Sequence, residues 1–302
     1  MFASAMNKKY ILGLLAILLV QGLTWAQMPH DAIYMKKNSV CVAGMYGYST
    51  WNRYWENSLK RENLNIGTHT TQSAMLMPAI GISNRVNLIL SLPYVWTSTS
   101  AGNLLGQKGV QDLSAWVKVK AIRAGGFSLN AIVGGSIPVG NYVPDFLPMS
   151  IGLQCRTLTG RLLANYKHPK TGLYVTAHGS YGWRSTMKID RDSYQADDRV
   201  YNTNQVSVPN VYDAAVRLGV LRRGWQTEVF AERQACLSGD NIRRNDMPFP
   251  TNNMEATLVG WYGKIQPRNI GVNARVGYVV DGLNVGQSTS YTVGVLYQFA
   301  VR

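Results

Sequence analysis

The sequence lacks most of the features that mark helical membrane proteins and disulfide-rich secreted domains. Its three cysteines, Cys41, Cys155 and Cys236, are too few and too scattered for a disulfide framework. Beyond residue 26, no apolar run approaches the ~20 residues that a membrane-spanning helix needs, and helical periodicity is nearly absent. These absences leave a soluble secreted protein, or a β-barrel whose strands hide their apolar residues by alternation.

The N-terminus carries the marks of a cleaved export signal. Lys8 and Lys9 form a positive region, residues 11–20 (ILGLLAILLV) form an apolar core, and Ala26 is a small residue at the expected cleavage position. A membrane anchor is the alternative, but the apolar run is too short to cross a bilayer. We therefore expect a signal peptide over residues 1–26.

Acidic residues are scarce, since 16 Asp and Glu stand against 30 Lys and Arg and give a formal net charge of +14. The basic residues are spread along the chain without a run of five or more, so a nucleic-acid partner is not expected. For an exported protein, we expect this charge to meet lipopolysaccharide phosphates or to line an anion-favouring lumen.

What the sequence has in abundance is alternation of apolar and polar residues. In 291–299 (YTVGVLYQF) and in 113–121 (LSAWVKVKA), the odd positions are apolar or aromatic, and in 270–280 (IGVNARVGYVV) the even positions are. A β-strand sends successive side chains to opposite faces, so each run makes one apolar wall and one polar wall. In a membrane barrel the apolar wall faces lipid and the polar wall faces the lumen.

The lengths of the connections point to a membrane barrel rather than to a soluble sandwich. Short turns and longer loops are expected to alternate along the chain, and this rhythm with an even strand count is typical of outer-membrane barrels with both termini in the periplasm. We predict twelve strands, at approximately 39–50, 66–82, 85–97, 110–123, 126–137, 150–166, 172–186, 209–222, 225–235, 253–264, 268–281 and 288–301.

The predicted fold class is therefore all-β: a transmembrane up-and-down antiparallel β-barrel over residues 39–302, in the outer membrane of a Gram-negative bacterium. Residues 27–38 precede the barrel. They are expected to form either a periplasmic tail or a plug that tucks into the lumen.

Several short motifs resemble the outer-membrane channel family named for the meta-pathway of phenol degradation. They are Leu92-Pro93-Tyr94, residues 109–113 (GVQDL), residues 136–140 (SIPVG) with Val139 where the family carries Thr, and the closing residues 294–299 (GVLYQF). The resemblance implies a barrel and passage of hydrophobic or aromatic compounds, and it supplies no catalytic residues. One departure is the end of the chain, where residues 300–302 follow Phe299 although many such barrels end on an aromatic residue.

The polar wall supplies the candidate functional residues. Most of its charges are expected to pair across the interior, and the remaining positive ones to bias a pore toward anions. The basic residues expected in the lumen are Arg85, Lys118, Lys120, Arg184, Arg217 and Arg275. Their acidic counterparts are Asp112, Asp213, Glu228, Glu232 and Glu255. In the loop at 236–252, Arg243 and Arg244 are candidates for binding surface phosphates.

The sequence contains no nucleotide-binding fingerprint, nucleophile elbow or clustered metal-ligand spacing, so no cofactor, metal or enzymatic activity is expected. The one enzyme-like pair is His178 and Ser180, which share a strand face as in a barrel-type lipid deacylase. Alternation assigns both to the polar face, whereas a lipid-cleaving site must face the bilayer. Two polar lumen side chains are the preferred interpretation.

The predicted function is an outer-membrane pore or passive transporter for small solutes, which include hydrophobic or aromatic compounds and anions. Twelve strands give an interior between that of filled eight-stranded barrels and that of open porins. The alternative is a non-conducting structural or surface-binding barrel, and a lipid hydrolase is a distant third. Expected partners are outer-membrane lipid, lipopolysaccharide, small solutes and the barrel-insertion machinery.

Overall fold

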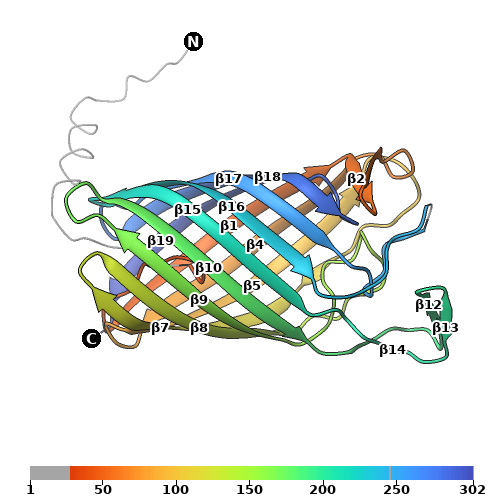
Figure 1. Cartoon of the computed structure of the whole chain (residues 1–302), viewed down its shortest axis with the longest axis horizontal. Coiled ribbons are helices and arrows are strands. Elements are labelled where there is room, and N and C mark those ends of the chain that lie inside the picture. The colour runs from red at the N-terminus through yellow and green to blue at the C-terminus, as the bar shows by residue number, and fades with distance from the viewer. Residues whose placement is uncertain (1–27, 245, 302) are drawn as a thin grey trace, which may run out of the picture.

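The alternating runs form long strands that close into one antiparallel barrel (Figure 1). The computed structural model describes residues 28–244 and 246–301, so the predicted signal peptide over 1–26 lies outside the described residues. The ring closes because β1 pairs with both β19 and β4, and β4 pairs with β5. Its twelve long strands are β1 (Ser39–Trp51), β4 (His69–Gly81), β5 (Val86–Thr99), β7 (Asp112–Ala124), β8 (Phe127–Pro138), β9 (Thr157–Lys167), β10 (Leu173–Arg184), β15 (Val211–Arg222), β16 (Trp225–Cys236), β17 (Glu255–Ile265), β18 (Ile270–Leu283) and β19 (Thr289–Ala300).

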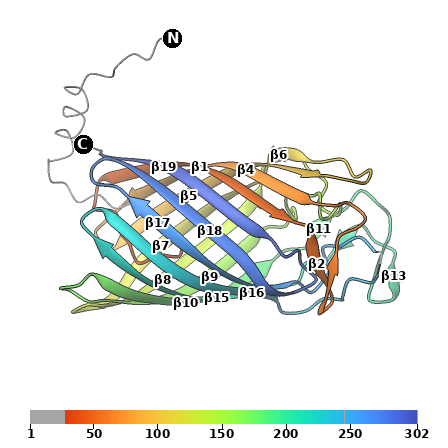
Figure 2. The same cartoon turned by 90° about the horizontal axis from the view of Figure 1, so that it is seen from above.

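Short turns gather at one end of the barrel and long loops at the other (Figures 1 and 2). The turns after β7 and β15 have two residues each, and Gly125 and Gly224 within them have φ of 56° and 85°. Tight hairpins require positive φ, which glycine adopts without strain. The long loops contain additional short strands: β2 (Arg53–Glu56), β3 (Leu59–Glu62), β6 (Lys108–Val110), β11 (Met187–Lys188), β12 (Tyr194–Ala196), β13 (Arg199–Tyr201) and β14 (Gln205–Val206).

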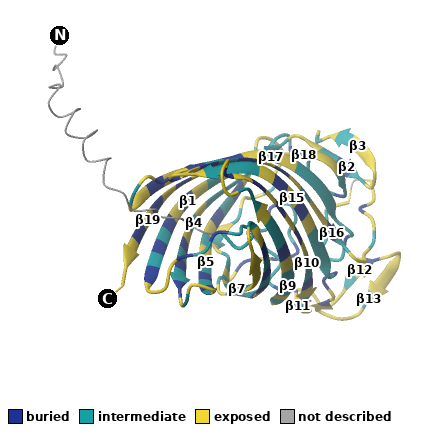
Figure 3. Ribbon diagram, turned by 60° about the vertical axis from the view of Figure 1, so that its left-hand side comes forward, coloured by how far each residue is buried: buried dark blue, intermediate teal, exposed yellow. Residues whose placement is uncertain are grey.

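The strands turn their apolar faces outward, as the alternation predicts. Figure 3 shows buried and exposed positions alternating along the strands. In β19, Val293 and Val295 are 53% and 58% exposed, whereas Leu296 between two outward residues is 1% exposed. Exposed valine, leucine, isoleucine and aromatic side chains recur on every long strand of the barrel. An apolar band of this kind around a closed antiparallel barrel is the surface that meets lipid.

Two predicted strands are shorter in the structure. The second begins at His69 rather than at 66, and its pairing with β5 is interrupted between Leu76 and Ala79, around Pro78. This irregularity is expected because proline has no N–H to donate to the ladder. The sixth begins at Thr157 rather than at 150.

Among the described residues, no helix is long and apolar enough to cross a membrane.

Residues 150–156 instead end the loop between β8 and β9, which folds against the long-loop mouth of the barrel. The Tyr142 hydroxyl donates to Asp112 Oδ1 at 2.7 Å, and the Thr97 hydroxyl donates to the Met149 carbonyl at 2.7 Å. Ile151 packs with Tyr142 and Val95 in a small buried cluster. This loop therefore covers part of the outer mouth.

Candidate functional site: the barrel lumen

Residues 28–35, here called the N-terminal segment, lie inside the barrel, where Lys118 of β7 holds them. The Lys118 ammonium donates to the carbonyl oxygens of Met28 at 2.8 Å, Asp31 at 2.7 Å and Ile33 at 3.2 Å. It also forms an ion pair with Asp31 Oδ1 at 2.9 Å, and the Lys118 side chain is fully buried. The three N–H donors of this ammonium thus point at oxygens of the segment.

The local sequence of the segment explains its compact shape. The Asp31 carboxylate accepts hydrogen bonds from the backbone N–H groups of Met28 at 2.7 Å and Ile33 at 2.9 Å, which fold the chain into a turn around it. The Tyr34 ring lies 4.2 Å from the Lys120 ammonium, within cation–π range. Asp31 therefore both shapes the segment and neutralises the charge that anchors it.

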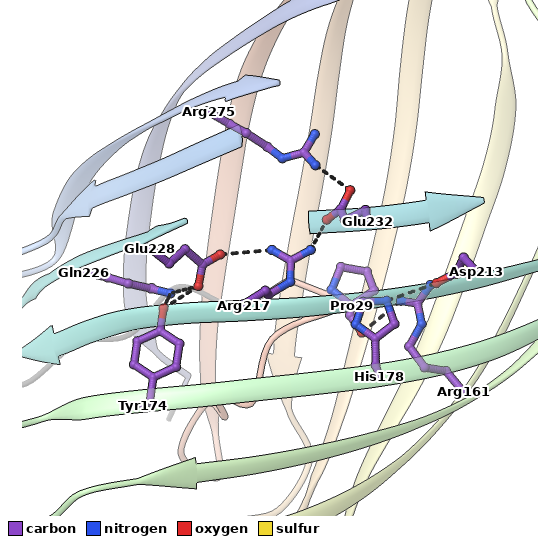
Figure 4. Close-up of polar contacts among 10 residues, drawn as sticks. All are labelled: Pro29, Arg161, Tyr174, His178, Asp213, Arg217, Gln226, Glu228, Glu232 and Arg275. Carbon is purple, nitrogen blue, oxygen red and sulfur yellow. Dashed lines mark hydrogen bonds and ion pairs between the residues drawn. The ribbon is translucent and has the colours of Figure 1, made fainter. Parts of the chain in front are cut away.

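A second contact to the segment comes from Arg161 of β9 (Figure 4). Its guanidinium donates to the Pro29 carbonyl at 3.4 Å and forms an ion pair with Asp213 Oδ2 at 3.1 Å. Asp213 also meets His178 Nε2 at 3.0 Å and accepts a hydrogen bond from the Ser180 hydroxyl. His178 and Ser180 therefore both bind the same carboxylate, which is not the nucleophile–base arrangement of a hydrolase.

A chain of ion pairs, buried at Arg217 and Glu228, joins β15, β16 and β18 (Figure 4). Arg217 pairs with Glu228 at 2.9 Å and with Glu232, and Arg275 pairs with the other Glu232 oxygen at 2.7 Å. Glu228 also accepts a hydrogen bond from the Tyr174 hydroxyl. The side chains of Arg217 and Glu228 are only 3% and 4% exposed, so each charge depends on its partners for solvation.

His30 of the segment lies among positive charges. Burial is the largest cause that lowers the pKa of His30 well below its ordinary value of 6.5, and Arg217, Arg275 and Arg161 lower it further. His30 is therefore neutral in the docked segment at neutral pH.

The opposite side of the lumen is apolar and rich in sulfur. Met45 of β1 is directly paired with Met75 of β4, and Met77 lies two residues further along the same face. Met35 of the segment, only 1% exposed, belongs to the same buried cluster as Met45 and Met77, and Met28 and Met75 pack against that cluster. We call Met45, Met75 and Met77 the methionine patch.

The lumen offers no evident metal site in the part of the chain that is described, because His, Cys, Asp and Glu side chains do not gather there in groups of three. The methionine patch packs as a hydrophobic surface, and thioether side chains commonly fill irregular interiors. The chemistry of the lumen wall is that of binding and charge compensation.

Comparison with known proteins agrees with this geometry. Residues 61–230, more than half of the 302-residue chain, match the family described as Putative MetA-pathway of phenol degradation. The chain belongs to this family. A search of curated proteins found no match.

One solved structure shares the fold of this family member at low sequence identity, and others are more distantly similar. An outer membrane channel from Pseudomonas putida F1 is similar with a TM-score of 0.70 and 16% identity, over 91% of this chain and 100% of the other. The translocator domain of autotransporter NalP from Neisseria meningitidis is similar at 0.48 and 12%, over 97% and 94%. The porin KdgM is similar at 0.44 and 11%, over 85% and 99%. The protein is an outer-membrane β-barrel.

Most of the predicted lumen residues lie on the inner face, and some lie elsewhere. Asp112 lies at the outer mouth against Tyr142. Arg184 lies at the outer end of β10 and donates to the Pro209 carbonyl at 3.2 Å. The structure places these predicted residues inside the barrel: Lys118, Lys120, Asp213, Arg217, Glu228, Glu232 and Arg275.

Two of the lumen predictions are wrong. Arg85 is exposed in the turn that precedes β5, because that strand begins at Val86. Glu255 pairs with Arg233, which has the same parity as the exposed Val229 and lies with it on the outer face of β16. Glu255 has the same parity as the exposed Val259 and Trp261 of β17, so alternation itself assigns it to the outer face.

The loop candidates lie on the exterior. Arg243 forms an exposed ion pair with Asp198, and Arg244 is exposed. Binding of surface phosphates by these two residues stays a prediction.

Arg161, Lys264 and Asp31 were not predicted as lumen residues. Arg161 was missed because the strand was expected to start at 150, where the parity is ambiguous. From Thr157 onward, the exposed Leu158 and Leu162 alternate with the inward Arg161, and this signal is readable in the sequence. Lys264, which is 3% exposed, could have been found in the same way from the exposed Trp261 and Ile265 on the opposite face.

Proposed function

We propose that the protein is a passive, non-enzymatic outer-membrane channel for small solutes, and that the N-terminal segment occupies its lumen when the channel is at rest. The supporting observation is the way the segment is held. Residues 28–35 form no β-ladder with the wall, and Lys118 and Arg161 contact them largely through backbone carbonyl oxygens. Such contacts can be exchanged for water or solute without opening the barrel.

The charges of the lumen support a preference for anions. The inward cationic side chains outnumber the inward carboxylates of the wall: Lys118, Arg161, Arg217, Lys264 and Arg275 against Asp213, Glu228 and Glu232. When the segment withdraws, Asp31 leaves with it, and the wall keeps an excess of positive charge. A positively charged constriction favours anions.

The second candidate is a non-conducting structural or surface-binding barrel. The paired charges at Arg217 and Glu232 and the docked segment both favour it, because each fills space inside the lumen. Lipopolysaccharide contacts and recognition by the insertion machinery belong to either proposal and remain predictions.

Planar-bilayer conductance separates the two candidates. The full chain is expected to show small or intermittent currents, and a variant without residues 28–34 is expected to show a larger steady current with a reversal potential that favours chloride over potassium. Both proteins should first show the heat-dependent electrophoretic shift of a folded barrel. If the folded deletion variant carries no current, the channel proposal is wrong and the non-conducting barrel is supported.

A further inference from the structure

The contacts of the N-terminal segment also indicate what the lumen binds. Lys118 and Arg161 donate hydrogen bonds to the carbonyl oxygens of two consecutive residues, Met28 and Pro29. We infer that these two cationic side chains form a site for the oxyanion of a small organic acid with an apolar body, and that the segment imitates this solute. The inference rests on the proposed channel function and names its substrate class.

The first argument is the charge of Lys118. Its cross-strand neighbours are Asn87 on β5 and Ile132 on β8, and both are neutral. Its ion-pair partner, Asp31, comes from the segment. When the segment withdraws, the Lys118 ammonium loses this carboxylate together with three carbonyl oxygens, and neither cross-strand neighbour is acidic. A cation that faces a narrow lumen without an acidic neighbour favours an anion as the replacement. An entering carboxylate or sulfonate can supply that replacement.

Arg161 is suited to a secondary role at the same site. Part of its guanidinium is already engaged with Asp213, and the rest reaches the Pro29 carbonyl. Without the segment, Lys118 has no carboxylate partner, whereas Arg161 still pairs with Asp213. The site then carries little more than one net positive charge, which suits a monoanion better than a dianion such as free phosphate. The site therefore fits a monoanionic head group.

The second argument is the apolar surface beside these cations. Met28 places its carbonyl oxygen on Lys118 while its side chain packs against the cluster that contains the methionine patch. A single residue of the segment thus presents an oxygen to the cation and an apolar chain to the patch. A small amphipathic acid has the same two parts.

Trp116 joins the two halves of the site. Its ring packs against the methionine cluster, and the Arg161 guanidinium lies 5.4 Å from the ring centroid. The ring has room because Gly134 lies opposite on β8, where an added Cβ would come within 2.2 Å of a Trp116 ring carbon. Methionine side chains adapt to different shapes, so we expect the apolar body of the solute to be variable and the charged end to be fixed.

The test measures saturable solute flux into proteoliposomes that contain the full mature chain. Three probes separate the two recognition elements: hexanesulfonate, methanesulfonate with the same head but almost no apolar body, and hexyltrimethylammonium with the same body and the opposite charge. Sulfonates stay ionised and do not leak through lipid as a neutral acid. We expect the half-saturation concentration of hexanesulfonate to be at least about tenfold lower than that of methanesulfonate.

Lys118→Met keeps an unbranched side chain that is one atom shorter and removes its charge. We expect this variant to conduct methanesulfonate and to lose saturation by hexanesulfonate, with the half-saturation concentration raised at least about tenfold. Lys37→Met is the matched control, because Lys37 is exposed at the short-turn end of the barrel, and its kinetics should equal those of the unmodified chain.

The outcomes separate the inference from the channel proposal. If no probe crosses in the unmodified chain or in Lys118→Met, the channel proposal itself fails. If probes cross but the two sulfonates saturate alike, or if Lys118→Met leaves the hexanesulfonate kinetics unchanged, the oxyanion site is wrong and the channel proposal stands. Equal saturation by hexanesulfonate and hexyltrimethylammonium would show that the methionine patch acts alone, and it would also overturn the inference.

Discussion

The two sides of the lumen wall are stabilised by different means. On one side, Arg217, Glu228, Glu232 and Arg275 satisfy one another within the wall. On the other side, the methionine patch is completed by Met35 and Met28 of the N-terminal segment. The ion pairs of the charged side therefore form without any residue of the segment, whereas the apolar side and Lys118 depend on it. The difference suggests that the charged side maintains the barrel and the apolar side maintains the closed state.

The largest expected effect is on the charged side. Arg217→Met should lower the free energy of unfolding by ~3–5 kcal/mol, because it leaves the buried Glu228 carboxylate without its cation. Urea unfolding of the protein in lipid vesicles measures this loss. Arg275→Met is the matched variant and should cost less, because Arg275 is 25% exposed and Glu232 keeps Arg217 as a partner. A loss of unfolding free energy below ~1 kcal/mol in Arg217→Met would show that the charged side does not maintain the barrel.

On the apolar side, a core substitution should open the channel rather than unfold the barrel. Met35→Ala removes a side chain that is 1% exposed, and the lost packing should weaken docking of the segment by ~2–5 kcal/mol. We expect a higher open probability in planar bilayers with nearly unchanged urea unfolding. Met35→Leu preserves the volume and should behave like the unmodified chain. If Met35→Ala unfolds the barrel instead, the segment is part of the scaffold.

Acidification should loosen the segment through His30. Its pKa is lowered from 6.5 in the docked state by burial and by nearby arginines, so the undocked segment binds the proton more readily. Docking is thus at full strength above pH 6.5 and weakens as the pH falls toward the lowered pKa. Each pH unit in that window changes the docking equilibrium by up to about tenfold.

Conductance measured as a function of pH tests this coupling. The open fraction of the unmodified chain should rise on acidification, and His30→Gln, which cannot take up a proton, should remove the rise that begins near pH 6.5. An unchanged pH profile in His30→Gln would contradict the coupling and assign the response to other groups.

The smallest effect is expected outside the lumen. Arg233 pairs with Glu255 on the outer face near the long loops, and its side chain is 44% exposed. Arg233→Ala should change the free energy of unfolding by less than ~1 kcal/mol, because an exposed ion pair contributes little. The same urea titration as for Arg217→Met gives a direct comparison between an exposed and a buried arginine pair. A loss as large as that of Arg217→Met would contradict the distinction.

The candidate site could be predicted only in part from the sequence. Strand parity identified Lys118, Asp213 and Arg217 as inward residues, because a strand alternates its faces whatever it pairs with. Two assignments to the lumen were wrong: the parity of β17 was misread for Glu255, and the start of β5 was placed too early for Arg85. Strand parity could not indicate that Asp213 binds Arg161, His178 and Ser180 together, since these residues come from three different strands.

The sequence by itself determined the barrel. Alternation, glycine-bearing two-residue turns and the rhythm of short and long connections are local properties, so twelve strands and their outward apolar faces follow from residues close together along the chain. Only the tertiary structure decided what fills the barrel. Residues 27–38 are compatible with a tail or a plug, and the outcome for residues 28–35 depends on a buried ammonium about ninety residues away that needs their oxygens. Such a contact between distant parts of the chain has no local pattern from which it can be predicted.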